Sequence, residues 1–338
     1  MTIKTLTLAA ALGAFGAASA TAQDVTIRIH HFMSEKASLH ANMLAVFEEK
    51  VETASDGRIA IELFPAMSLG GRPGDLYDQA ADGAVEAILT LPGYTAGRFN
   101  QTEVFELPFI MEDSVATSKA FWSLIESDLQ DSEYDEVHVL SGWVHGPGLL
   151  HSEEPITKLE DLAGMEMRGP TRVVTELLGE LGATPVGMPL PAIPENLSKG
   201  VISGAALPWE ITPSIRLPEL VTNHTEFSGN TALYTATFIL AMNQDVYDSM
   251  PEDLRSILDA ETGAAMAEFA AGVMLEGDVV GRKQAEANNI IQLDEAETER
   301  WIAASQPVYD AWAARATDEG FDGVAAIENA RALIAANK

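Results

Sequence analysis

Cysteine is absent from the whole chain of 338 residues, which excludes disulfide bonds, thiolate metal sites and thiol nucleophiles. A chain of this length does not need disulfides, because it can bury a large core in two domains. The chain also lacks a G-x-S-x-G elbow, a P-loop and a G-x-G-x-x-G after a strand. Its seven histidines never show the His-x-x-x-His spacing that places two metal ligands on one helix face. These patterns indicate no cofactor, no metal ion and no known catalytic motif, and they leave open only an enzyme built from residues far apart in the sequence.

Positive charge is scarce, because 20 Lys and Arg residues stand against 51 Asp and Glu residues, a formal net charge of −31. Such a surface repels nucleic acid and anionic lipid head groups, so neither is an expected partner. It also repels anionic ligands, although salt limits this effect to about 8–10 Å. Any site for an anion must therefore be built around local cations and backbone N–H groups.

Hydrophobic runs are short, and after the N-terminus each one is broken by charge, glycine or proline, so no membrane span is expected. The N-terminus has Lys4, then an apolar stretch over 6–18, then Ala20-Thr21-Ala22. This is the layout of a secretory signal peptide over residues 1–22, cut before Gln23. The alternative, a buried N-terminal helix, would show polar positions at helical spacing. The mature chain is thus expected outside the cytoplasm, most simply in a bacterial periplasm.

Segments typical of strands alternate with segments typical of helices along the rest of the chain. The predicted strands cover residues 25–32, 58–64, 85–91, 137–144, 165–168, 202–209 and 234–242. One predicted helix begins after Gly169-Pro170 and ends at Gly182. From Pro251 the chain is expected to be helical to its end, with an apolar stripe of Leu254, Ile257, Leu258, Ala265 and Phe269. This rhythm predicts a largely parallel sheet with covering helices, and no low-complexity linker separates the parts.

One local sequence resembles a known family. Residues 159–168, LEDLAGMEMR, are similar to the "LeDLkGlklR" segment of the DctP-type solute-binding subunits of tripartite ATP-independent periplasmic (TRAP) transporters. Further pieces of the same pattern lie around this segment in family order, at residues 67–71, 102–109, 181–186, 197–202, 242–243 and 249–251. Each piece is weak alone, but their shared order through most of the mature chain makes the resemblance specific.

The resemblance implies a fold and a function. The fold is an α/β two-lobe periplasmic binding protein fold with crossing strands and a long C-terminal helix that spans both lobes. We expect lobe I to comprise residues 23–146 plus 236–275, and lobe II residues 147–235 plus 276–338. The implied function is capture of a small organic carboxylate, without catalysis, and its delivery to the integral membrane subunits of a TRAP transporter.

The arginine that ends the "GlklR" strand forms a salt bridge with the ligand carboxylate in that family, and Arg168 matches it here. A guanidinium offers a fork of N–H donors that fits two carboxylate oxygens. The helix expected after Gly169-Pro170 would add N–H groups and a positive dipole nearby. The alternative is a surface arginine that pairs with Glu166 or another acid.

The sequence departs from the sialate-binding branch of the family in three places. That branch has another arginine where this chain reads His145-Gly146-Pro147-Gly148, an asparagine at the position of Leu207, and a phenylalanine at the position of Leu190. Apolar surface thus replaces polar contacts to a polyhydroxylated ligand. The resemblance therefore indicates a smaller or flatter acid, aromatic or otherwise apolar.

Further candidate ligand contacts come from residues at strand ends and in the loops that follow, where open α/β sheets bind ligands. Trp209, Trp143, Phe32 and Tyr94 are candidates for apolar walls, and for each of them core packing is the alternative. His145 is either a hydrogen-bond donor to the ligand or a structural histidine.

Two further arginines, Arg72 and Arg98, lie near other parts of the expected site. Arg72, after a glycine pair, is either a second cation near the anion or a surface charge, and Arg98 is expected to hold the loop after Tyr94.

Three alternatives to this function stay open. A periplasmic hydrolase or isomerase could use scattered Asp, Glu and His side chains on a small acid, and turnover would reveal it. A structural or adhesive protein would have no cleft around Arg168. A binding protein of an ATP-driven transporter differs from a TRAP subunit only by the family resemblance.

Overall fold

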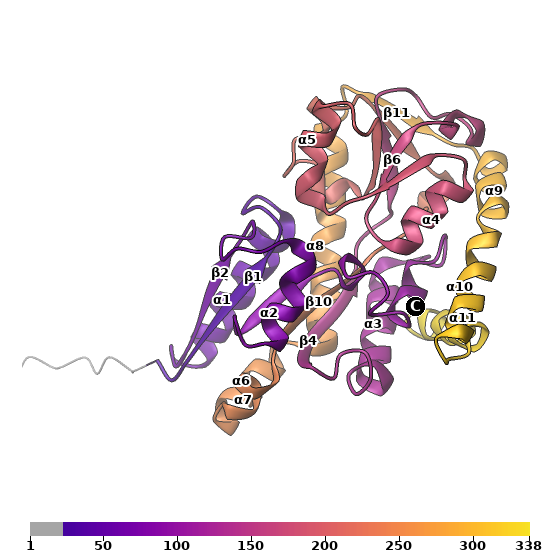
Figure 1. Cartoon of the computed structure of the whole chain (residues 1–338). Helices are drawn as coiled ribbons and strands as arrows, with labels where there is room; N and C mark the ends of the chain where they lie inside the picture. Colours follow the sequence, from indigo (N-terminus) through magenta and orange to yellow (C-terminus); the bar gives the residue numbers. More distant parts are fainter. Residues whose placement is uncertain (1–22) are drawn as a thin grey trace, which may run out of the picture.

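The computed structural model describes residues 23–338, so the predicted signal peptide, residues 1–22, lies outside the described residues. Two sheets form the frame of the molecule (Figure 1). The first sheet has the order β2-β1-β3-β10-β4, and its strands are β1 (Val25–His31), β2 (Ile59–Phe64), β3 (Ala87–Thr90), β4 (Val137–Val144) and β10 (Thr237–Asn243). β1 runs parallel to both β2 and β3, whereas β10 is antiparallel to β3 and β4.

The second sheet has the order β11-β9-β5-β8-β6-β7. Its strands are β5 (Leu149–Ser152), β6 (Glu166–Gly169), β7 (Thr184–Gly187), β8 (Gly204–Leu207), β9 (Asn223–Glu226) and β11 (Asn289–Gln292). β5 is antiparallel to β8 and β9, and the other pairs are parallel. Both sheets are therefore mixed, because β5 and β10, the first strands after the chain crosses between sheets, run against their neighbours.

Helices cover both sheets. In the half built on the first sheet these are η1 (Leu39–Leu44), α1 (Ala45–Ala54), α2 (Leu76–Ala81), α3 (Ser114–Leu124), α6 (Gln244–Ser249) and α7 (Glu252–Ala260). In the half built on the second sheet they are α4 (Arg172–Glu180), α5 (Ile193–Ser198) and α9 (Glu295–Ala304). α4 turns Val173, Val174, Leu177 and Leu178 to the core, and the chain leaves it through Gly182 at φ 99°, the left-handed conformation that the predicted helix end requires.

The two halves, called lobe I and lobe II after their sheets, are joined by two crossing segments and by long helices. The chain crosses at residues 145–148 and returns at residues 234–236. α8 (Gly263–Gln284), 22 residues long, packs against α3 and β4 in lobe I and against the turn Trp209–Ile211 in lobe II (Figure 1). No helix within residues 23–338 combines the length and apolar character needed to cross a membrane.

The C-terminal part of the chain differs from two expectations. β11 interrupts the segment that was predicted to be helical to the end. Ala265 is exposed and the side chain of Phe269 is 37% exposed, so the predicted apolar stripe ends with α7. The helical conformation is interrupted at Thr262, the N-cap of α8. The helical spacing of apolar residues therefore cannot be counted from α7 into α8.

The predicted strands are all present, with ends that differ by at most three residues from the predicted ones, but four strands were missed. These are β5, β7, β9 and β11, each four residues long and rich in polar side chains or proline. The strands of the first sheet lie within the residues expected for lobe I, and those of the second sheet lie within the residues expected for lobe II. The boundaries themselves stay a prediction. Of the last two helices, α10 (Gln306–Asp318) contacts α4 in lobe II, and α11 (Gly323–Ala336) contacts α3 in lobe I.

Candidate ligand-binding site

A narrow cavity lies where the two lobes meet, with about 380 Å³ of space between its atoms, part of which is open to solvent. Its walls come from both lobes and from both crossing segments. The lining residues are Phe32, Met33, Leu91, Tyr94, His145, Arg168, Pro170, Leu190, Leu207, Pro208, Glu210, Ile211, Tyr234, Ala236 and Phe238. Most of these side chains are apolar, so the few polar groups decide how a ligand is oriented.

Arg168 is the cation of this cavity. It lies in β6 and is 1% exposed, and burial lowers the pKa of its guanidinium. Its Nε donates to the carbonyl of Met188 at 2.9 Å and its Nη1 to the carbonyl of Ala206 at 3.0 Å. No carboxylate among residues 23–338 lies within ion-pair distance of it, so pairing with Glu166 does not occur. A buried cation without a counter-ion is a strong attractor for an anion.

Tyr94 and Phe32 form the lobe I wall of the cavity. Their rings meet edge to face with centroids 5.1 Å apart. The Tyr94 hydroxyl accepts the backbone N–H of Leu190 at 3.1 Å, a contact between the lobes. Burial raises the pKa of Tyr94, and the nearby positive charge of Arg168 opposes that rise. The Tyr94 hydroxyl thus stays protonated beside the guanidinium.

His145 lines the cavity but has no N–H for a ligand. Its Nδ1 bonds to the carbonyl of Gly146 at 2.6 Å, and its Nε2 accepts the backbone N–H of Ala236 at 3.0 Å. This pattern assigns the proton to Nδ1, and burial lowers the pKa of the ring to about 4. His145 is therefore a neutral group that ties the two crossing segments together, which is the structural alternative rather than the donor role.

Three predicted contacts lie outside the cavity. Trp209 points away, and its Nε1 donates to Glu226 at 2.8 Å. Trp143 is fully buried and stacks on Phe238, with centroids 6.1 Å apart, so it supports a lining residue from behind. The side chain of Arg72 is 87% exposed, and it pairs with an acid three residues along the chain at 3.7 Å.

The cavity therefore contains Arg168, Phe32, Tyr94, His145 and Leu190 of the predicted site residues, together with Leu207. Arg98, expected to be structural, pairs with two acids, and its guanidinium lies 4.2 Å from the ring centre of Tyr77.

Sequence reasoning missed the second tyrosine, the second phenylalanine and the only carboxyl of the lining. These are Tyr234, Phe238 and Glu210. Tyr234 and Phe238 stand in and just after a crossing segment, which the predicted strand 234–242 contained. Glu210 directly follows Trp209, which was chosen instead. The sequence analysis covered the segments that contain these residues, but the sequence does not indicate which side chains of those segments face the cavity.

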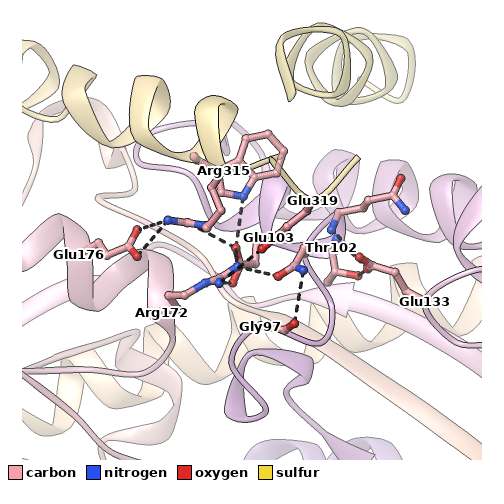
Figure 2. Close-up of polar contacts among 11 residues, drawn as sticks. Gly97, Thr102, Glu103, Glu133, Arg172, Glu176, Arg315 and Glu319 are labelled. Atoms are coloured by element: carbon pink, nitrogen blue, oxygen red, sulfur yellow. Dashed lines mark hydrogen bonds and ion pairs between the residues drawn. The ribbon is translucent and has the colours of Figure 1, made fainter. Parts of the chain in front are cut away.

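An ion-pair cluster joins the lobes beside the cavity (Figure 2). Glu103 of lobe I, 5% exposed, accepts two hydrogen bonds from Arg172 at the start of α4, at 2.9 and 2.8 Å. Arg315 of α10 lies 3.7 Å from Glu103 on its other side and bonds to Glu176 of α4. Burial raises the pKa of Glu103, and the hydrogen bonds from Arg172 oppose that rise. Trp312 of α10 also donates a hydrogen bond from its Nε1 to Glu103, at 3.2 Å.

A second interlobe contact consists of buried carboxyls. Glu210 in lobe II accepts the hydroxyl of Ser38 in lobe I, and its backbone N–H donates to Oδ1 of Asp278 on α8 at 2.8 Å. Oδ2 of Asp278 is buried without a hydrogen-bond partner among the described residues, and it lies against Gly146, where a Cβ would come within 1.9 Å of it. Burial raises the pKa of Glu210 to about 7, and burial with the charge of Glu210 raises that of Asp278 to about 8.

The buried carboxyls of Glu210 and Asp278 are expected to make the folded protein lose stability as the pH rises from about 7 to 9, a range in which the buried histidines are already neutral in the folded and the unfolded state. Unfolded Asp and Glu titrate near pH 4, so between pH 4 and the folded pKa values of about 7 and 8 the folded state holds more protons than the unfolded state. The contribution is complete below pH 4 and is lost through that window. Across the range from about pH 7 to 9, the free energy of unfolding of Asp278→Asn should fall by on the order of 1–3 kcal/mol less than that of the wild type.

Thermal unfolding at several pH values measures this slope. Glu160→Gln is the matched control, because Glu160 is exposed and Arg300 lowers its pKa. An equal slope in wild type and Asp278→Asn would show that the buried pair does not titrate as described. Glu106, another buried carboxyl with a pKa of about 7, keeps part of the slope in both proteins.

Two lobes that meet over a narrow cavity with a buried, unpaired arginine define a binding protein for a small anion. No group of three His, Asp or Glu side chains in the described part of the chain is arranged to hold a metal ion. The chain belongs to the bacterial extracellular solute-binding protein family 7, whose model matches residues 29–316. This membership confirms the predicted two-lobe α/β fold and the predicted class, DctP-type solute-binding proteins, which are not enzymes.

Two solved structures are similar over almost the whole chain. A TRAP solute-binding protein from Rhodoferax ferrireducens, in complex with copurified benzoate, is 47% identical, with a TM-score of 0.90 and coverage of 92% of this chain and 98% of that chain. A marine metagenome TRAP solute-binding protein specific for aromatic acid ligands, in complex with 3-hydroxybenzoate, is 39% identical, with a TM-score of 0.91 and coverage of 94% and 100%.

A curated relative carries a different ligand name. The C4-dicarboxylate-binding periplasmic protein of Rhodobacter capsulatus is 26% identical, and the match covers 93% of each chain. Relatives within one family thus take chemically different acids, so the choice of ligand must be argued from the cavity itself.

Proposed function

We propose that this protein binds a monoaromatic carboxylate and delivers it to the membrane subunits of a TRAP transporter. The observation that carries the proposal is the cavity lining, in which one buried arginine without a counter-ion faces walls that are otherwise mostly aromatic or aliphatic. Arg168 keeps N–H donors beyond those held by Met188 and Ala206, and these can receive a ligand carboxylate. The ligands of the two solved relatives, benzoate and 3-hydroxybenzoate, support the same class.

The proposal separates aromatic acids from other acids. Arg168 is the only Lys or Arg among the lining residues, so the second carboxylate of a C4-dicarboxylate would be buried without a cation. A polyhydroxylated acid would lose its hydration against walls that offer few hydrogen-bond partners. A flat ring, in contrast, replaces water at Phe32, Tyr94 and Phe238 and gains apolar burial.

A thermal-shift screen tests this choice with benzoate, 3-hydroxybenzoate, mandelate, succinate and galactonate. A ligand at about 100 times its dissociation constant should stabilise the folded protein by roughly 2.7 kcal/mol. The three aromatic acids are expected to raise the melting temperature, and succinate and galactonate are not. A larger shift with succinate than with benzoate would contradict the proposal.

We also propose that the two lobes, with the boundaries given above, move as units about the crossing segments. Contacts across the cavity, such as Tyr94 with Leu190 and Ser38 with Glu210, require the lobes to be together. A ligand can enter only when they are apart, so binding includes closure.

The mature protein is expected to begin at Gln23 and to reside in the periplasm. The physical reason is the signal-peptide layout of residues 1–22, with small residues at Ala20 and Ala22 before the cut. Intact-mass spectrometry of a periplasmic extract measures the start of the chain. A cytoplasmic product that retains Met1 would contradict this expectation, and replacing Ala22 with a bulky residue should block the cut.

A further inference from the structure

Glu210 stands out among the residues that line the cavity, because it is the only carboxyl there and it has no cation. It is 6% exposed, and no Lys, Arg or His among residues 23–338 pairs with it within ion-pair distance. One hydroxyl, that of Ser38, donates to its Oε2. A carboxyl that is buried against apolar walls with so few partners is held at an energetic cost, and any hydroxyl that comes within reach reduces that cost.

The carboxyl of Glu210 is held in place from three directions. Its backbone N–H is fixed by Asp278 on α8, its Oε2 by Ser38 on the lobe I side, and its chain by the short helical turn Trp209–Ile211. The side chain therefore reaches from lobe II across to lobe I beside the ligand space. Such fixed geometry is what a group needs to recognise one atom of a ligand.

Glu210 and Arg168 both line the cavity, and both belong to lobe II. Arg168 bonds to the carbonyl of Ala206, and Glu210 follows four residues later on the same segment. No hydrogen bond or ion pair joins the two side chains in the described part of the chain, and Leu207, Ile211 and Phe238 also line the space.

We propose that Glu210 is a specificity residue, which hydrogen-bonds a hydroxyl on the ring of the aromatic carboxylate that Arg168 holds. The inference rests on the proposed function, because it needs a ring whose carboxylate is at Arg168. A site built to bond a ligand hydroxyl discriminates against the analogue without it, since the buried protein group is then left with fewer partners. A hydroxyl at the meta or para position of such a ring points away from the carboxylate and could reach Glu210, whereas an ortho hydroxyl lies beside the carboxylate and its arginine.

Calorimetry with four ligands tests the inference: benzoate and its 2-, 3- and 4-hydroxy derivatives. Wild type should bind the 3- or the 4-hydroxy acid about 10-fold more tightly than benzoate, and the 2-hydroxy acid should show no such gain. Glu210→Met should bring this ratio to within about 2-fold of one while benzoate still binds. Glu210→Gln, which keeps the shape and a weaker hydrogen bond, should give an intermediate ratio and decides the matter where the methionine variant does not fold.

Glu133→Gln is the matched control. It changes a half-buried carboxyl that accepts hydrogen bonds from Gln101 and Thr102 and neither lines the cavity nor holds Glu210, so the hydroxyl ratio should stay at the wild-type value. No preference for any hydroxylated acid in wild type, or a preference that Glu210→Met and Glu210→Gln retain, overturns the inference and leaves the proposed function intact. Failure of wild type to bind benzoate and all three derivatives overturns the proposed function and this inference with it.

Discussion

Replacing Arg168 with alanine is expected to weaken the binding of an aromatic carboxylate by roughly 10²–10³-fold or more. The ligand carboxylate would then be buried in the closed cavity without a cation, which costs on the order of 3–5 kcal/mol. Arg168→Lys should recover only part of the affinity, because an ammonium keeps the charge but loses the planar fork of donors. Calorimetry with benzoate measures both variants.

The stability of the unliganded protein should change much less than the affinity. Alanine removes the donors to the carbonyls of Met188 and Ala206, at about 1 kcal/mol each, and also removes a desolvated cation, which offsets that loss. Arg300→Ala is the control, because Arg300 is half exposed and pairs with acids on the surface. If Arg168→Ala bound benzoate as tightly as the wild type, the ligand carboxylate would not bind at Arg168.

Replacing Arg172 with alanine is expected to weaken ligand binding by roughly 10- to 100-fold without touching the proposed ligand position. Its two hydrogen bonds to Glu103 join the lobes, and Glu103 is nearly buried while the side chain of Arg172 is 22% exposed. The pair should therefore contribute about 1–3 kcal/mol to closure, between the values for exposed and buried pairs. Apparent affinity falls as the closed fraction falls.

X-ray scattering of free and ligand-saturated protein reads the closure directly. Wild type should have a smaller radius with ligand, and Arg172→Ala should need more ligand to reach the same radius. Arg216→Ala is a suitable control, since Arg216 forms an exposed ion pair with Glu219 on the same short turn. If Arg172→Ala lowered the ligand affinity but left the radius of the ligand-saturated protein and its dependence on bound ligand unchanged, Arg172 would act on the ligand and not on lobe closure.

The family pattern led to Arg168, and the reason is chemical as well as statistical. A strand that ends in arginine and precedes a helix offers both a cation and free N–H groups, so its residue type and position carry information. The strands with long apolar runs, such as β4 and β10, were equally readable, because full burial leaves a continuous hydrophobic signal. The four-residue strands with polar side chains gave no such signal.

The choice of Trp209 over Glu210 shows where sequence reasoning ended. The two are neighbours in a short 3₁₀ turn, in which successive side chains point about 120° apart. An aromatic residue is the reasonable choice for an apolar wall, yet the rotation of the turn sends Trp209 to Glu226 and turns Glu210 to the cavity. That rotation is set by contacts with α8, some 70 residues further along the chain, and local patterns do not contain it.

The anchoring of Arg168 has a consequence for the order of events during capture. Both carbonyls that hold the guanidinium, those of Met188 and Ala206, belong to the same lobe as Arg168 itself. In the open form that we propose, these two hydrogen bonds would keep the guanidinium aligned on lobe II, so an arriving solute could dock there before lobe I closes over it. Stopped-flow traces would then resolve into a first phase whose rate grows with solute concentration and a second, slower phase whose rate reaches a plateau set by the swing of the lobe.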